Sequence, residues 1–265
     1  MLGVGEIRNH SASLRSGARI ILARQRIGGF EAQLPRYIRP MSAQEQTTAG
    51  NAVIETILRR RSIRGPYHDR PVPRGHVELV LASGLAAPSS KNAQPWRFHV
   101  LETVGLRTRI ADAVDRSSGI EEYVPHDPRT GNPSPHWSST VLESSAVLRT
   151  AAVAIAIENR GVFSGGRATL YAASHEALIG NLTAYGFETM GLGTALENMW
   201  LAANSLGIDA AFLGDLVIAE GEARTLLGIE GDLMGVLAMG YSLEGPAPKQ
   251  APPPVTQTDS PVVWH

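Results

Sequence analysis

Apolar residues recur along the chain with the periods of both helices and strands. Between positions 47 and 61 their spacing predicts a helix, and the arginines at 59–61 close it where the C-terminal end of a helix favours positive charge. A second helical stripe covers 76–87 and stops at Pro88. Apolar and polar residues then alternate over 96–101, which predicts a half-buried strand.

The second half of the chain predicts strands on either side of a long helix. Residues 151–157 are an apolar run of strand length, typical of a strand that is covered on both faces. The helical pattern over 171–206 is the longest in the sequence, and Gly207 is placed to end it. Two further strands are expected at 210–217 and 233–241, around a short helix at 220–227.

Other regions fall outside these patterns. Residues 115–139 are rich in proline and turn-forming residues, so we expect a loop there, within a lid insertion at about 115–145. Five prolines in residues 246–254 predict an extended spacer. The expected organisation is a basic N-terminal arm (1–46), a compact domain (47–245) and a proline-rich C-terminal extension (246–265) that docks on a partner subunit.

The N-terminal arm is basic. The first 40 residues hold seven arginines against two glutamates. Such a segment can bind an anionic partner, act as an organellar presequence, pack along a partner subunit or be loosely ordered. Arginine is also the usual cation of this protein, since Lys91 and Lys249 are its only lysines. The charge of the arm alone therefore identifies no function.

The composition is that of a globular protein without cysteine chemistry. Of the 265 residues 43% are hydrophobic, and the formal net charge is −1, so the chain can bury a core and lacks the basic character of nucleic-acid-binding proteins. No apolar stretch has the length of a membrane span, and the first residues do not form a secretory signal. We therefore expect a cytoplasmic protein without nucleic-acid or membrane partners. The absence of cysteine excludes thiol nucleophiles and iron–sulfur clusters, so redox chemistry would need a bound cofactor.

Two familiar kinds of site are not supported. Gly191-Leu-Gly193 begins like a dinucleotide fingerprint, but the third glycine is missing and the segment lies within a helical pattern. The eight histidines show no metal-ligand spacing. We therefore expect neither a Rossmann cofactor site nor a metal site.

A cluster of arginines lies at the end of the first predicted helix. Residues 60–64 read Arg-Arg-Ser-Ile-Arg, which places three guanidinium groups and one hydroxyl within five positions. Guanidinium groups bind phosphate oxygens through paired, charge-assisted hydrogen bonds. The cluster therefore indicates a phosphate site, although a solvated run of charge would have the same sequence pattern.

A loop rich in hydrogen-bonding groups joins the second predicted helix to the first predicted strand. Residues 87–96 read Ala-Pro-Ser-Ser-Lys-Asn-Ala-Gln-Pro-Trp, with a proline near each end. The hydroxyl and amide groups between the prolines could bind a ring of alternating donors and acceptors, such as the pyrimidine edge of a flavin. They could equally satisfy the backbone of the loop itself.

Taken in order, these segments resemble the FMN-dependent nitroreductase family. The resemblance rests on the arginine cluster, on Pro71-Val-Pro73 and on the proline-framed loop at 87–96. It continues at Asn198-Met-Trp-Leu-Ala-Ala203, Leu206-Gly-Ile, Phe212-Leu-Gly214, Leu226-Leu-Gly-Ile229 and Gly240-Tyr241. The match covers most of 52–241 but is weak across the lid and at 162–185.

The resemblance implies a fold and a set of ligand-binding residues. The fold would be α+β with three layers (α/β/α), a mixed and mostly antiparallel sheet, and an intertwined homodimer with FMN at its interface. Arg60 and Ser62 would hold the FMN phosphate with help from Arg61, and Arg64 would lie toward the ribityl and pyrimidine part. The loop residues that would reach the flavin, in many members from the other subunit, are Pro88, Ser89, Ser90 and Asn92.

Three further positions follow from the same resemblance. The backbone of Gly214 would lie close to the reactive N5 edge of the flavin. Asp215 departs from the Gly-Gly or Glu-Gly pattern of many relatives and would add a carboxylate there. Lys249 is the candidate for the basic residue that relatives direct to the phosphate. No side chain is expected to be catalytic, because flavin N5 carries the chemistry.

The implied activity is ping-pong hydride transfer. NAD(P)H would reduce FMN, leave, and be replaced by a small electron acceptor such as a nitroaromatic or a quinone. Two alternatives stay open: a specialised dehydrogenase or dehalogenase that acts on one metabolite, and a non-catalytic module that binds flavin or a partner. Candidates for the acceptor pocket, or for simple loop packing, are Tyr123, His126, His136, Trp137 and Phe163.

Overall fold

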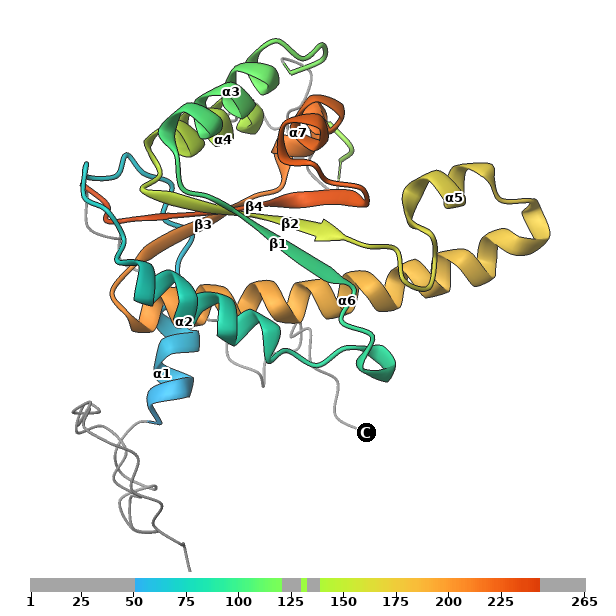
Figure 1. Cartoon of the computed structure of the whole chain (residues 1–265), viewed down its shortest axis with the longest axis horizontal. Coiled ribbons are helices and arrows are strands. Elements are labelled where there is room, and N and C mark those ends of the chain that lie inside the picture. The colour runs from blue at the N-terminus through green and yellow to red at the C-terminus, as the bar shows by residue number, and fades with distance from the viewer. Residues whose placement is uncertain (1–50, 121–129, 133–138, 244–265) are drawn as a thin grey trace, which may run out of the picture. The chain divides into compact units, whose positions relative to one another are not determined.

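The computed structural model describes residues 51–120, 130–132 and 139–243 (Figure 1). The predicted arm, the predicted C-terminal extension and part of the predicted lid lie outside these residues. The helices are α1 (Ala52–Arg59), α2 (Arg74–Leu85), α3 (Val104–Asp115), α4 (Thr140–Thr150), α5 (Gly166–Ala172), α6 (His175–Ser205) and α7 (Glu220–Leu227). The strands are β1 (Trp96–Leu101), β2 (Val153–Asn159), β3 (Asp209–Leu213) and β4 (Asp232–Gly240), and two 3₁₀ turns are η2 (Ser90–Asn92) and η3 (Asp215–Ala219). None of these helices combines the length and hydropathy that a membrane span requires.

The four strands form one sheet between two layers of helices. Their order is β1-β2-β4-β3, and each neighbouring pair is antiparallel. Helices α2 and α6 cover one face of the sheet, and α3, α4 and α7 cover the other (Figure 1). This arrangement confirms the expected three-layer α+β fold. The described strands contribute only antiparallel pairs, so the expected parallel component of a mixed sheet is not found among them.

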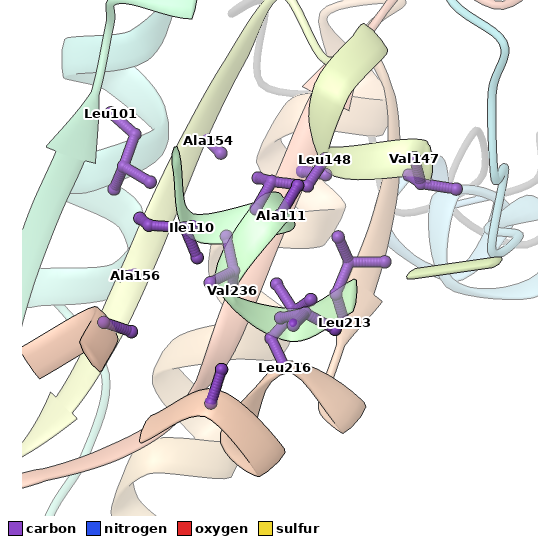
Figure 2. Close-up of a cluster of buried hydrophobic side chains, with 14 of the residues drawn as sticks. Leu101, Ile110, Ala111, Val147, Leu148, Ala154, Ala156, Leu213, Leu216 and Val236 are labelled. Carbon is purple, nitrogen blue, oxygen red and sulfur yellow. The ribbon is translucent and has the colours of Figure 1, made fainter. Parts of the chain in front are cut away.

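The central strand β2 is buried along its whole length. Ile155 and Ile157 pack in the core formed with α2 and α6, whereas Ala154 and Ala156 lie in the second core cluster, against α3 and α4 (Figure 2). Successive side chains of a strand alternate between its faces, so a strand with a helical layer on each side needs apolar residues at every position. This explains the uninterrupted apolar run in the sequence.

Helix α6 is the longest element. Its 31 residues extend for about 46 Å. It begins after Ser174, whose side chain accepts a hydrogen bond from the amide of Ala177, and Gly207 follows its end with a φ of +71°. Helix α2 packs closely on it at Gly84, where a Cβ would lie only 2.7 Å from Cγ of Met199. A glycine at this position therefore permits the close approach of the two helices.

Most predicted elements lie within a few residues of the observed ones, but three differ. β3 ends at Leu213, so the second half of the strand predicted at 210–217 is wrong and forms η3 instead. The helical pattern over 171–206 is divided at 173–174 into α5 and α6. Helix α4 begins at Thr140, so the last part of the predicted lid range is a helix that packs on α3.

Candidate functional site

The arginine cluster follows directly from the end of α1. At Arg60 the backbone leaves the helical conformation, with a ψ of 140°, although its amide still bonds to the last turn. The amide of Ile63 then donates a hydrogen bond to the carbonyl of Ala210 in β3 (3.0 Å). Residues 60–64 are thereby held between the end of α1 and the edge of the sheet.

Arg60 lies against α6. Its guanidinium carbon is 4.5 Å from the ring centroid of Trp200, and its Nε is 3.1 Å from Oε1 of Glu197. Cation–π stacking and an ion pair together fix the plane of a guanidinium group. The side chain is still 27% exposed, and the neighbouring Ser62 is exposed as well. Arg60 is therefore an oriented cation at the surface of the domain.

The other arginines of the cluster point in different directions. Nη1 of Arg61 donates to the carbonyl oxygens of Arg59 (3.2 Å) and Arg60 (3.4 Å), so this side chain folds back over the end of α1. Nε of Arg64 is 3.9 Å from Oε2 of Glu143, which belongs to α4. The structure therefore directs Arg60 toward α6 and Arg64 toward the opposite helical layer.

The loop 88–95 between α2 and β1 has three non-glycine residues in the left-handed region. Lys91, Asn92 and Gln94 have φ angles of 52°, 53° and 47°. Each costs about 1–2 kcal/mol for an ordinary L-residue, so hydrogen bonds have to hold this backbone. The amide of Gln94 donates to Oγ of Ser89 (2.9 Å), and the amide of Asn92 donates to the carbonyl of the same serine (3.0 Å). Ser89 thus satisfies the loop backbone, as one of the two interpretations of the sequence expected.

Helix α6, which contacts Arg60, also contacts this loop. The Thr194 hydroxyl shares its proton between the carbonyl of Gly191 in its own helix (2.7 Å) and the carbonyl of Pro88 (3.1 Å). A Cβ at Gly191 would lie 3.4 Å from Cβ of Ser89. Thr194 and Trp200 are separated by about 9 Å along the axis of α6. The two segments that the sequence singled out therefore attach to one helix, within about two turns of each other.

Gly214 and Asp215 lie where β3 gives way to η3. Gly214 has a helical backbone (φ −73°, ψ −32°). Oγ of Ser144 in α4 donates to Oδ2 of Asp215 (3.2 Å). The carboxylate of Asp215 therefore contacts the layer that contains α4. Lys249 lies outside the described residues.

Phe163 is the one acceptor-pocket candidate that falls within the described residues. Its ring centroid is 5.8 Å from Nζ of Lys91, and the residue is 39% exposed. Phe163 thus lies beside the loop 88–95. The other candidates lie outside the described residues: Tyr123, His126, His136 and Trp137.

A buried carboxylate that the sequence pattern did not identify holds the segment around Phe163. Glu188 of α6 is fully buried. It accepts hydrogen bonds from the amides of Phe163 (2.6 Å) and Ser164 (2.9 Å), from the Ser164 hydroxyl (2.7 Å) and from Nδ2 of Asn159 (3.0 Å). Burial by itself raises the pKa of Glu188, but these hydrogen bonds outweigh it and hold the pKa below its ordinary value. An ionised carboxylate therefore fixes this segment.

Comparison with known proteins identifies the family. The sequence profile described as "Nitroreductase family" matches residues 57–241. The chain belongs to the nitroreductase family. Among solved structures, the NADPH:FMN oxidoreductase from Vibrio harveyi complexed with NAD+ superposes with a TM-score of 0.55 at 19% identity, over 81% of this chain and 80% of that one. A Desulfovibrio desulfuricans structure in complex with FMN gives a TM-score of 0.51 at 22% identity, over 80% and 99% of the two chains. At these identities the solved structures establish a common fold.

Curated relatives of this nitroreductase-family chain align over a short segment only. The NADH dehydrogenase of Thermus thermophilus is 38% identical over 65 residues, which are 24% of this chain and 31% of that protein. The chain thus matches about a third of the length of such relatives. The profile match over 57–241 therefore establishes the family, and the solved structures establish the fold. The short alignments to curated relatives do not establish the activity.

Replacing Glu188 by Gln should destabilise the protein at neutral pH by about 1–3 kcal/mol. Oδ1 of Asn159 accepts a hydrogen bond from the amide of Gly161 (3.1 Å), so the Nδ2 group of Asn159 must face residue 188. A glutamine there offers one acceptor oxygen, whereas the carboxylate of Glu188 offers two. A carboxyl group with a depressed pKa stabilises the folded state above its unfolded pKa, and this contribution is lost as the pH falls through the folded value. The difference between parent and variant should therefore shrink in acid.

Urea denaturation at a series of pH values measures this difference. Glu176→Gln is the matched control, because Glu176 is exposed on the same helix, and it should change the free energy of unfolding by no more than about 0.5 kcal/mol. A Glu188→Gln penalty that stays constant with pH would show that the ionised carboxylate is not the stabilising form.

Proposed function

We propose that the protein is an FMN-dependent NAD(P)H oxidoreductase. The observation that carries the proposal is that α6 supports both the oriented Arg60 and the loop 88–95 within one nitroreductase-family domain. The oxidoreductase from Vibrio harveyi and the FMN-bound structure from Desulfovibrio desulfuricans share this fold. A phosphate-binding corner and a loop rich in hydroxyl and amide groups suit the two ends of FMN.

The donors at the end of α1 suit the FMN phosphate. Trp200 and Glu197 fix the direction of the Arg60 guanidinium, and charge-assisted bonds to phosphate depend on such alignment. Ser62 adds an exposed hydroxyl, and Arg61 adds positive charge beside it. We assign these donors to the phosphate, with Lys249 as a further candidate.

The loop 88–95 suits the flavin ring. Asn92 offers an exposed amide, and Ser90 offers a hydroxyl. Ser89 accepts a hydrogen bond at Oγ within the loop but keeps its hydroxyl proton for donation.

The remaining assignments are Pro88 in the same loop, Arg64 toward the ribityl and pyrimidine part, and the backbone of Gly214 with Asp215 near the N5 edge.

The residues of the chain bind and orient, and the cofactor reacts. When bound, FMN supplies ping-pong hydride transfer from NAD(P)H to a small acceptor such as a nitroaromatic or a quinone. Phe163 offers an exposed aromatic surface beside the loop, which suits a flat acceptor. Glu188 holds the backbone of this phenylalanine.

We further propose that the protein acts as a homodimer through α1 and α6. No residue of α1 is buried, and a free helix of eight residues is not stable in water. A groove of about 520 Å³ lies between α1, α2 and α6. A second copy of the chain would cover this apolar surface and bring another loop 88–95 to the dimer interface. The exposed apolar residues of α1 are Val53, Ile54, Ile57 and Leu58.

Replacing Ile57 by Asp should convert the dimer to a monomer, because a charge buried in an apolar interface is strongly unfavourable. Ile57 is 45% exposed in the single chain. Leu142→Asp is a matched control, since Leu142 is 44% exposed on α4, across the sheet. Sedimentation of the FMN-loaded proteins measures the change. If the Ile57→Asp variant sediments as a dimer, as the Leu142→Asp variant should, the dimer does not form through this interface.

Replacing Arg60 by Ala should weaken FMN binding by about 10- to 100-fold, because one charge-assisted phosphate contact is removed. Fluorescence quenching of FMN titrated with apoprotein measures the dissociation constant. Arg59→Ala removes the neighbouring exposed arginine and should change the constant less than about threefold. Equal affinities of the parent and Arg60→Ala would remove Arg60 from the phosphate site.

Rapid mixing of the FMN-loaded protein with NADH or NADPH tests the activity itself. Under anaerobic conditions we expect the oxidised flavin absorbance to bleach with at least one of the two, and to return when a quinone is added. If the nucleotide bleaches the flavin before any acceptor is added, the two half-reactions follow a ping-pong order. Absence of bleaching with both nucleotides would exclude the general reductase and favour the specialised enzyme or the binding module.

A further inference from the structure

A pocket of about 550 Å³ lies at the end of the sheet where β1 stops and β2 starts. Residues from three segments line it, 67–71, 102–107 and 149–152. The loop 88–95 adjoins the opposite end of β1, and the length of this strand separates the two places by about 17 Å. None of the lining residues is among those proposed to hold FMN.

A buried guanidinium lines this pocket. Arg107 is 2% exposed, and its Nη1 donates to the carbonyl oxygens of Leu101 (2.9 Å) and Glu102 (2.8 Å). Its Nε is buried without an acceptor, and no carboxylate within the described ranges forms an ion pair with it. Burial lowers the pKa of Arg107, yet a guanidinium stays protonated in proteins. Such a buried cation is costly unless an anion compensates it.

Two of the other charged residues around the pocket are engaged in ion pairs with residues other than Arg107. Arg149 forms ion pairs with Asp112 and Asp115. The carboxylate of Glu102 is 3.6 Å from a guanidinium nitrogen of Arg74. Glu102, the one carboxylate among these two residues, is therefore paired with Arg74 and not with Arg107.

The side chains that line the pocket carry one positive charge more than negative, with three arginines against Asp69 and Glu102. The guanidinium carbon of Arg70 is 4.0 Å from the ring centroid of Tyr241, which orients its fork. Asp69 is the one lining carboxylate outside an ion pair in the part of the chain that the structure describes. Arg70 and Arg107 both line the pocket with it.

We propose that this pocket binds a phosphate group, either free or carried by a small molecule, between Arg107 and Arg70. Guanidinium forks match phosphate oxygens and would supply the missing counter-charge. The pocket has the volume of a typical small-molecule site, so there is room for more than a single ion. The proposal does not depend on the flavin chemistry.

The FMN-loaded protein is the right material for the test, because bound FMN occupies the other phosphate-binding corner. Inorganic phosphate and ribose 5-phosphate are titrated by isothermal calorimetry at constant ionic strength, made up with chloride. We expect one saturable site per chain, and binding at least about tenfold weaker in Arg70→Gln. Tighter binding of ribose 5-phosphate supports a phosphorylated molecule, and equal affinities support free phosphate.

Further variants locate the site. Arg107→Met should abolish binding. If Arg107→Met does not fold, Arg70→Gln still tests the site, because Arg70 is exposed. Arg116→Gln, which removes an exposed arginine paired with Glu222, should bind like the parent. The proposal is overturned if no saturable binding occurs. It is also overturned if binding persists in Arg70→Gln and Arg107→Met but is lost in Arg60→Ala.

Discussion

The packing of α6 against the sheet is the constraint on which the site depends. Ala195, Met199 and Ala203 are fully buried in the core that this helix shares with β2 and β4. Their burial fixes the rotation of the helix, and Thr194 and Trp200 take their directions from it. A shift of register by one residue would turn every side chain by about 100°. The loop 88–95 and Arg60 would then lose their common support.

The helices α1, α2, α6 and α7 and the four strands could be predicted because their signals are local, whereas α3, α4 and most of α5 were not predicted. The apolar run of β2 and the apolar stripe of α6 reflect which of their faces are covered. Such a pattern can be recognised in the sequence without knowing which other elements cover the face. The end of β3 could not be predicted in this way. Apolar residues continue past Gly214, and the fully buried Leu216 packs in the cluster with α3 and α4 instead of extending the strand. The break before α6 carried a usable signal, since Ser174 is a favoured residue for starting a helix.

The residue types of the candidate site could be predicted from the sequence, but their arrangement in space could not. Arg60 and the loop 88–95 stand out because each segment concentrates charged or hydrogen-bonding groups within a few residues. Their relation through Trp200 and Thr194 depends on tertiary packing, which no local pattern reports. Glu188 looks like any acidic residue of a helix, next to the half-exposed Phe187. Only the amides that converge on it distinguish it from a surface carboxylate.

The left-handed residues of the loop 88–95 have a thermodynamic consequence for recognition. Lys91, Asn92 and Gln94 are held in a rarely adopted conformation by contacts within the domain. A ligand that meets this loop finds it already shaped, so little conformational entropy remains to be lost on association. The ordering is accomplished during folding instead. Affinity gained by preorganisation is thus balanced by a reduced stability of the domain when it is empty.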